Sequence, residues 1–142
     1  MNFAEMTVDE FSTPSPLSVD HNEKLPAAWQ MMKDRNIRHL VIQDEQEFPV
    51  GILSHRDLVT FSQAKNFEEI RVKDIMSEKI YTVVSGTKLY SVALTMSEKK
   101  IGSALVINAD SGELAIFTAT DALNALVEIL RGDRDDPLQQ VG

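Results

Sequence analysis

The chain has 142 residues and a formal net charge of −8 at pH 7, with 22 acidic against 14 basic side chains. This balance argues against a nucleic-acid partner, which needs clustered lysine and arginine to displace counterions from phosphates. The sequence contains no cysteine, which excludes disulfides and thiolate chemistry and fits a reducing compartment. It shows no secretory leader and no apolar run near the ~20 residues that cross a bilayer, so we expect a cytoplasmic protein without a membrane partner.

The first part of the chain predicts a short helix, a strand and a longer helix. Thr7-Val8-Asp9-Glu10 has the Thr-x-x-Glu form of a capping box, which indicates a helix start. Pro14 and Pro16 then exclude helix, and Leu17-Ser18-Val19 predicts a short extended segment. From about Leu25 to Arg35, apolar residues recur every three or four positions, which predicts an amphipathic helix.

A pair of strands and a second helix follow. The apolar runs Leu40-Val41-Ile42 and Val50 to Leu53 are separated by a turn from Gln43 to Pro49, so they predict two paired strands. A helix from about His55 to Ala64 comes next. Together these elements form a β-α-β-β-α unit.

The same order of elements recurs after an offset of 121 − 57 = 64 residues, without a gap. Eight of the 56 aligned positions from 8 to 63 are identical in the second copy, and six of these eight are apolar. The second copy predicts strands at Tyr81 to Val83, Ala104 to Ile107 and Leu114 to Phe117, and helices at Thr87 to Lys100 and Ala119 to Leu130. Duplication of one supersecondary unit is the simplest cause.

The duplication sets the expected domain organisation. We expect a first repeat with its N-terminal helix over residues 1–66, a second repeat over 67–131, and a flexible acidic tail over 132–142. A three-stranded sheet with helices mainly on one face leaves apolar surface that its twin can cover. The predicted fold class is therefore α/β (α+β), with two β-α-β-β-α repeats packed with pseudo-twofold symmetry.

A hydroxyl followed three residues later by an aspartate occurs at the same place in both repeats, as Ser54 with Asp57 and as Thr118 with Asp121. At a strand-to-helix junction, the hydroxyl and the free N–H groups of the first turn favour a phosphate, and Arg56 could add a fixed cation. A carboxylate suits a pair of ribose hydroxyls. The same residues also form ordinary helix N-caps, worth about 1 kcal/mol each. Both interpretations stay open, and they are compatible.

The string Gly51-Ile52-Leu53-Ser54-His55-Arg56-Asp57-Leu58 and its partner from Thr118 to Asp121 closely resemble the motif of tandem CBS-domain pairs, also called Bateman modules. The resemblance covers roughly residues 7 to 130. It implies a regulatory module that binds an adenosine-containing ligand, most often AMP, ADP or ATP, in the cleft between the repeats. It also implies a homodimer, with the hydroxyl allotted to phosphate and the aspartate to ribose, and no required cofactor.

The predicted ligand-binding residues fall at equivalent places in the two repeats. They are Ser18, Arg38, His39, Ser54, His55, Arg56 and Asp57 in the first repeat, and Thr82, Ser103, Thr118, Thr120 and Asp121 in the second. The first site has Gly51, which lets a ligand or a neighbouring chain approach closely. The second has Ala115 there and Ala119-Thr120 in place of His55-Arg56, so we expect it to hold phosphate more weakly.

Three classes of function remain for such a chain. The leading one is an adenine-nucleotide sensor that signals to an unknown effector protein in trans. The alternative is a structural dimerisation module with no physiological nucleotide ligand. An enzyme is not expected, because Ser54, His55 and Asp57 lie on one helix turn and cannot converge as a hydrolytic triad. His21, His39 and His55 show no metal-ligand spacing.

Overall fold

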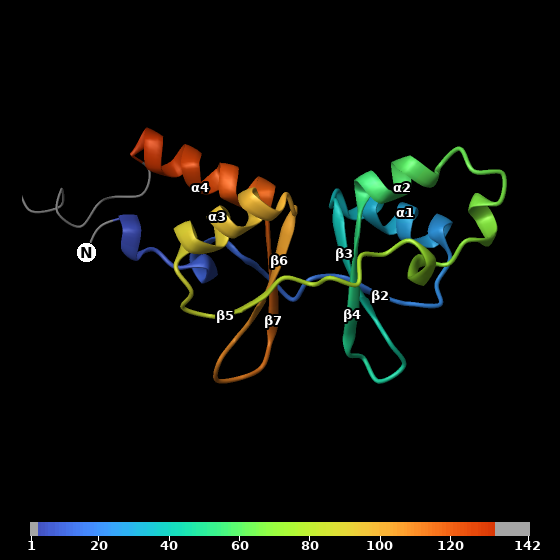
Figure 1. Cartoon of the computed structure of the whole chain (residues 1–142), viewed down its shortest axis with the longest axis horizontal. Helices are drawn as coiled ribbons and strands as arrows, with labels where there is room; N and C mark the ends of the chain where they lie inside the picture. Colours follow the sequence, from blue (N-terminus) through green and yellow to red (C-terminus); the bar gives the residue numbers. More distant parts are fainter. Residues whose placement is uncertain (1–2, 133–142) are drawn as a thin grey trace, which may run out of the picture. The chain divides into compact units, whose positions relative to one another are not determined.

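A computed structural model describes residues 3–132. Beyond Gly132, the predicted acidic tail lies outside the described residues. Over these residues the fold is mixed α and β, with four α-helices and two small sheets, which confirms the predicted fold class (Figure 1). The chain divides into two compact units, and each is described by itself. Residues 16–80 form the first-repeat unit, while residues 3–15 and 81–132 form the second-repeat unit.

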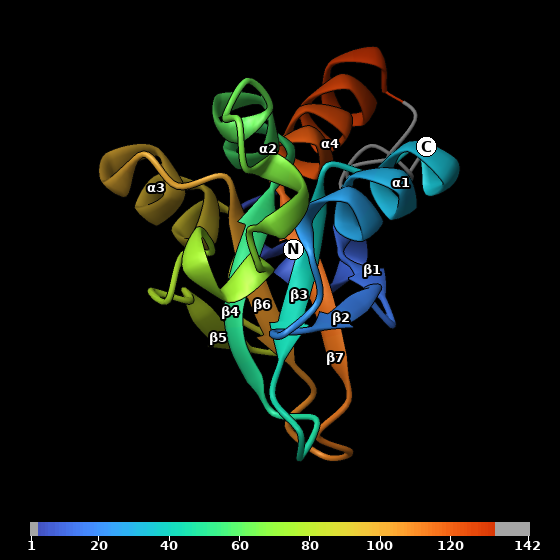
Figure 2. The same ribbon diagram turned by 90° about the vertical axis from the view of Figure 1, so that its right-hand side faces the viewer.

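The first-repeat unit contains a three-stranded sheet in the order β2-β3-β4. Strand β2 runs parallel to β3, and β3 runs antiparallel to β4 (Figure 2). The predicted order of strands and helices is confirmed, although the second helix ends at Phe61 and not near Ala64. The elements are β2 (Ser18–Asp20), α1 (Leu25–Arg35), β3 (His39–Gln43), β4 (Pro49–Ser54) and α2 (His55–Phe61), followed by the 3-10 helices η3 (Phe67–Glu69) and η4 (Val72–Asp74).

The second-repeat unit repeats this plan and adds a fourth strand, in the order β1-β7-β6-β5. The added strand β1 comes from the N-terminal segment and pairs antiparallel with β7. The elements are the 3-10 helices η1 (Phe3–Glu5) and η2 (Val8–Phe11), β1 (Thr13–Pro14), β5 (Thr82–Val84), α3 (Leu89–Lys99), β6 (Ser103–Ile107), β7 (Leu114–Thr118) and α4 (Ala119–Arg131).

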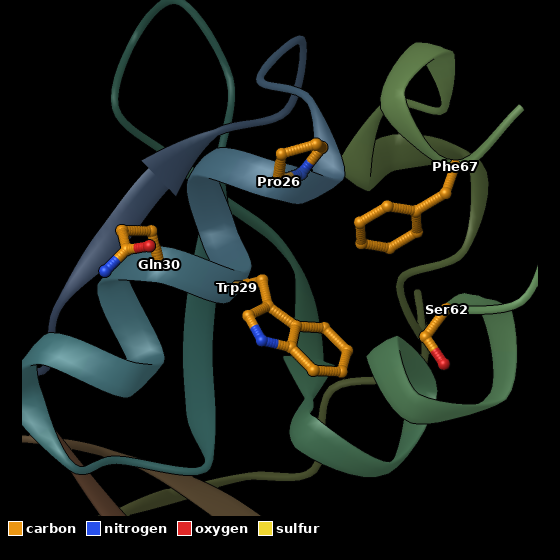
Figure 3. Close-up of a pocket in the computed structure, with 5 residues that line it drawn as sticks. All are labelled: Pro26, Trp29, Gln30, Ser62 and Phe67. Atoms are coloured by element: carbon orange, nitrogen blue, oxygen red, sulfur yellow. The ribbon is translucent and has the colours of Figure 1, made fainter.

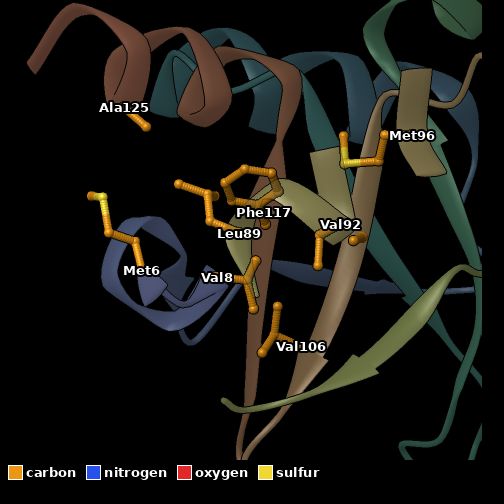
Figure 4. Packing of buried hydrophobic residues seen from close by; sticks show 9 residues of the cluster. Met6, Val8, Leu89, Val92, Met96, Val106, Phe117 and Ala125 are labelled. Carbon is orange, nitrogen blue, oxygen red and sulfur yellow. The ribbon is translucent and has the colours of Figure 1, made fainter. Parts of the chain in front are cut away.

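Each unit has its own apolar core, built where the helices pack on one face of the sheet. In the first-repeat unit, Leu25, Leu40 and Leu53 are fully buried in this core. In the second, Phe117 occupies the centre, and Met6 and Val8 of the N-terminal segment lie among its neighbours (Figure 4). Burial of these side chains supplies most of the driving force for folding.

The N-terminal segment therefore packs on the second repeat, and the corresponding segment 67–80 packs on the first. The exchange follows the 64-residue register closely. The Val8 N–H donates to the Thr87 carbonyl at 2.9 Å, and the Val72 N–H donates to the Glu23 carbonyl at 2.8 Å. The isolated bridge between Ile52 and Ser77 likewise matches the pairing of Ile116 with Thr13.

The compact units thus follow boundaries different from the predicted 1–66 and 67–131. The physical reason is that the core of each repeat is closed by an apolar segment that precedes the other repeat in the same chain. Residues 3–15 close the second core, and residues 67–80 close the first. Val8 and Val72 are each fully buried in this role. A repeat alignment cannot show this exchange, because the register is the same whichever copy receives the segment.

Candidate functional site

The junction between β4 and α2 carries the first of the two predicted hydroxyl–aspartate pairs. The Ser54 N–H and the Ser54 hydroxyl both donate to Oδ2 of Asp57, at 3.1 and 2.8 Å. The Asp57 N–H donates in return to the Ser54 hydroxyl oxygen at 3.2 Å. This reciprocal capping box satisfies donors that a helix start would otherwise leave unpaired, so the capping interpretation is confirmed.

The junction between β7 and α4 repeats this geometry. The Thr118 N–H and hydroxyl donate to Oδ2 of Asp121 at 2.8 and 3.0 Å, and the Asp121 N–H donates to the Thr118 hydroxyl oxygen at 3.3 Å. In both copies one carboxylate oxygen is occupied by the cap. Within residues 3–132, no hydrogen bond is recorded to the other oxygen, Oδ1, of either aspartate. Each junction is half-buried and so keeps one charged acceptor that a ligand could use.

The sheet of the first-repeat unit brings Arg38 and His39 to the same edge as the Ser54 junction. His39 lies opposite Ser54 in the β3–β4 ladder, and the His55 N–H donates to the Arg38 carbonyl at 2.8 Å. Ser18 opens β2 and lies beside Val41 in the parallel β2–β3 ladder, two residues along β3 from His39. The backbone therefore brings the Arg38, His39 and Ser54 positions together at the start of α2, with Ser18 further along the sheet.

The second-repeat unit brings its predicted residues together in the equivalent way. Ser103 lies opposite Thr118 in the β6–β7 ladder, and the Ala119 N–H donates to the Gly102 carbonyl at 3.0 Å. Thr82 opens β5, which runs parallel to β6. Thr120, in the first turn of α4, is exposed.

The side chains that distinguish the two junctions have unequal surroundings. The His55 ring packs against Trp29 of α1, with ring centroids 5.7 Å apart and planes tilted by 43°. Arg38 and Arg56 are exposed. Because the Ser54 hydroxyl donates to Asp57, its proton is not directed at the imidazole. The first junction thus has two exposed cations near it, which the second lacks at the equivalent positions Gly102 and Thr120.

Gly51 is small because a neighbouring chain segment crosses it. A Cβ at Gly51 would overlap the Met76 sulfur and would lie 2.8 Å from Met76 Cγ and 3.0 Å from the Ser77 carbonyl oxygen. Sequence reasoning left open whether a ligand or a chain approaches here, and the structure shows the chain. In the 64-residue register Ala115 corresponds to Gly51, and Ser12 corresponds to Met76. The second repeat thus has a smaller residue where the first has Met76, which explains by packing why it can have alanine in place of glycine.

Two further structural observations limit the chemistry of the described part of the chain. Within residues 3–132, no group of three or more histidine, aspartate or glutamate side chains could hold a metal ion. In the same range, none of the helices combines the length and apolar character needed to cross a bilayer.

Comparison with known proteins identifies the class. The model of the CBS domain family matches the chain twice, at residues 8–64 and 72–128. These matches cover most of the 142 residues, and both include a hydroxyl–aspartate junction. The chain belongs to the CBS-domain family and is a tandem CBS pair, which confirms the resemblance seen in the motif.

Similar proteins extend this assignment without fixing a function. An uncharacterized protein of Methanopyrus kandleri, MK0525, is 32% identical over 94 residues, which are 65% of this chain and 48% of that protein. The chain thus spans about half the length of this curated relative. CBSX2, solved in complex with AMP, is 23% identical with a TM-score of 0.72, covering 87% of this chain and 98% of that one. The CBS pair of MJ0100, solved with 5′-methylthioadenosine and S-adenosyl-L-methionine, is 22% identical with a TM-score of 0.73, covering 85% and 99%.

Proposed function

We propose that this protein is a regulatory CBS pair that binds an adenosine-containing ligand, with AMP, ADP or ATP the leading candidates, in the cleft between its repeats. The observation that carries the proposal is the duplicated capping box, in which each aspartate keeps one carboxylate oxygen available. CBSX2 with AMP and MJ0100 with two adenosyl compounds support the same ligand class. Modules of this family are regulatory and generally not catalytic, and we propose no turnover here.

The proposed ligand contacts follow from the chemistry of the junctions. Oδ1 of Asp57 or Asp121 accepts hydrogen bonds from the two ribose hydroxyls, because charged acceptors bind neutral donors strongly. The phosphate lies near the hydroxyl of Ser54 or Thr118. Arg38 and Arg56 add cations at the first junction only, so we propose tighter binding there for ligands that carry phosphate.

Calorimetric titration of AMP, ADP, ATP and S-adenosyl-L-methionine tests this proposal with the variants Asp57→Asn and Asp121→Asn. Asparagine keeps one side-chain oxygen for the cap and replaces the second oxygen with an N–H₂ donor. We expect Asp57→Asn to weaken binding about tenfold or more while the melting temperature hardly changes. Asp34→Asn serves as the control, since Asp34 is an exposed acid on α1 that accepts from Gln30.

Two outcomes would contradict the sensor. Absence of heat with all four ligands, in protein shown to be folded by circular dichroism, would favour the alternative of a structural dimerisation module. Equal weakening by Asp34→Asn would show that the effect comes from net charge and not from the junction.

We also propose that the protein is a homodimer, acts in the cytoplasm, and signals to an effector protein in trans through a ligand-dependent change in repeat packing. Support for the dimer comes from the apolar side chains that α4 exposes. Light scattering across micromolar concentrations tests it, and a monomer at all of them would refute it.

A further inference from the structure

Three rings form a chain of contacts in the first-repeat unit. The ring centroid of Trp29, on α1, lies 5.7 Å from that of His55 and 5.9 Å from that of Phe67. His55 is the first residue of α2 and directly follows Ser54 of the junction, whereas Phe67 begins η3. The Trp29 and Phe67 planes meet at 90°, the edge-to-face arrangement that aromatic pairs favour. Trp29 thus connects the first junction to η3.

Segment 67–80 continues from Phe67 and is anchored to the start of α1. The Leu25 N–H donates to the Ile70 carbonyl at 2.9 Å, and Val72 is fully buried in the same core as Leu25. The segment ends where the second-repeat unit resumes. A shift of Phe67 therefore acts on a stretch of chain that joins the two units.

A hollow of about 250 Å³ lies beside Trp29. Its lining residues come from α1, the end of α2 and η3, and they are Pro26, Trp29, Gln30, Ser62 and Phe67 (Figure 3). Trp29 is half-buried, and its Nε1–H donates to no residue in the range 3–132. A ring in a close-packed core cannot turn without displacing its neighbours, but here a hollow adjoins the indole. Trp29 therefore has room for a second position.

The His55 imidazole is available to a ligand. Neither of its nitrogens forms a hydrogen bond with any residue in the range 3–132, and the neighbouring Ser54 hydroxyl donates to Asp57. An imidazole N–H can therefore donate to a phosphate at this junction, and hydrogen bonds to charged acceptors are roughly twice as strong as neutral ones. A ligand with a phosphate thus competes with Trp29 for the imidazole, whereas a ligand without one does not.

The second repeat lacks this chain of rings. In the 64-residue register, Ala93 corresponds to Trp29 and Ala119 corresponds to His55. Coupling through these rings is therefore a property of the first junction, which is also the junction with the two exposed arginines.

We infer that Trp29 couples phosphate binding at the first junction to segment 67–80. The phosphate draws the His55 ring away from Trp29, the indole turns into the hollow, and Phe67 loses its edge-to-face contact. A ligand shifts such an equilibrium only by the difference in its affinity for the two arrangements, and the phosphate supplies that difference. This inference rests on the nucleotide binding proposed above and names the residues through which occupancy of that site is transmitted.

Tryptophan fluorescence tests the coupling in the wild type, because Trp29 is the single tryptophan of the chain. AMP is titrated, with adenosine as the phosphate-free control. We expect the emission to change with AMP and to saturate at the same concentration as the calorimetric binding. Saturating adenosine should change it much less. His55→Ala introduces the residue that the second repeat has in register, and it should abolish the AMP-dependent change while adenosine still binds.

Phe67→Leu tests the far end of the chain of rings. Because coupling is reciprocal, loss of the contact that holds Trp29 in its ligand-free position should favour the ligand-bound arrangement. We expect Phe67→Leu to tighten AMP binding about fivefold or more and to leave adenosine binding unchanged. Phe48→Leu is the matched control, since Phe48 is 65% exposed in the loop between β3 and β4.

The outcomes separate this inference from the proposed function. Calorimetric binding of AMP without a change in Trp29 emission would overturn the coupling and leave the sensor in place. Equal weakening of AMP and adenosine binding by Phe67→Leu, in protein with the circular dichroism of the wild type, would assign Phe67 a packing role alone and overturn the coupling as well. Absence of binding with every ligand would refute the sensor and the coupling together.

Discussion

Gly51 links a sequence motif to a packing constraint. In CBS-like motifs a glycine three residues before the junction hydroxyl suggests close approach of a ligand. At Gly51, however, Met76 and Ser77 occupy the space where a side chain would extend. The second repeat has a larger residue, Ala115, and in register a smaller partner, Ser12. The larger residue at 115 is thus accompanied by a smaller partner, as close packing requires.

We predict that Gly51→Ala destabilises the protein by about 1–3 kcal/mol, because the added methyl group overpacks a filled space. Chemical denaturation measures the change. The same substitution should cost less in a Met76→Ser background, which recreates the Ala–Ser pair of the second repeat. A double-mutant cycle without this coupling would contradict the packing explanation.

The two capping aspartates show how one residue serves structure and proposed binding together. Asp57 and Asp121 each hold a helix start with Oδ2. An alanine substitution would remove this cap as well as any ligand contact, and would confuse the two roles. Asparagine separates them, which is why the titrations above use it.

At the scale of elements, periodicity and punctuation predicted the helices and strands well. Helix α1 spans Leu25–Arg35 as the apolar spacing indicated. The ends of strands β2 to β7 lie within one or two residues of the predicted ends. Helix α2 ends at Phe61, earlier than the predicted Ala64. At this end the Ser62 hydroxyl donates a hydrogen bond to the Val59 carbonyl. Local hydrogen bonding of this kind leaves no periodic signal.

The destination of the N-terminal segment could not be predicted from local patterns. The 64-residue register extends upstream of residue 8, but it does not say which repeat receives the segment. Phe3 corresponds to Phe67, and Glu5 corresponds to Glu69. Lys88 Nζ lies 2.7 Å from Glu5, and Lys24 Nζ lies 3.5 Å from Glu69. The identity of Lys24 and Lys88 thus has a structural reason, because each lysine pairs with the glutamate of an exchanged segment.

This ion pair predicts a pH dependence. A hydrogen bond from Lys88 and its charge hold the pKa of the Glu5 carboxyl below its ordinary value of 4.5. The folded state therefore binds fewer protons than the unfolded state in this range. The contribution of the pair is complete above the unfolded pKa and is lost as pH falls through the folded one. The effect is small because both side chains are solvent-exposed.

Denaturation of the wild type and of Glu5→Gln at pH 3 to 7 measures this effect. We expect the variant to be slightly less stable at pH 7 and equal to the wild type at the acid end. Glu68→Gln is the control, since Glu68 is an exposed acid that forms no ion pair with any residue in the range 3–132. A stability difference that stays constant with pH would contradict the prediction.

At the scale of the whole molecule, each sheet is apolar on both faces. Val41 and Ile52 alternate with the core residues of the first-repeat unit, and Leu105 and Ile116 do so in the second. All four are buried, and alternation along a strand directs them away from the helices of their own unit. Each sheet therefore carries apolar side chains on the face opposite its own helices.

Deletion of residues 3–15 should disrupt one unit more than the other. It removes Met6 and Val8 from the core around Phe117, and it removes β1 from the sheet. We predict that amide hydrogen exchange accelerates across residues 81–132 and much less across 16–80. Equal loss of protection in both ranges would show that the two units unfold together.

The exchanged segment also affects the order in which the chain can fold during synthesis. Residues 3–15 leave the ribosome before the first-repeat unit, but the residues that cover them begin only after the 80 − 15 = 65 residues of that unit. At about 5–20 residues per second, Met6 and Val8 stay uncovered for several seconds or longer. The first-repeat unit can therefore fold completely while residues 3–15 are still uncovered, as a short apolar segment that nascent-chain chaperones can bind.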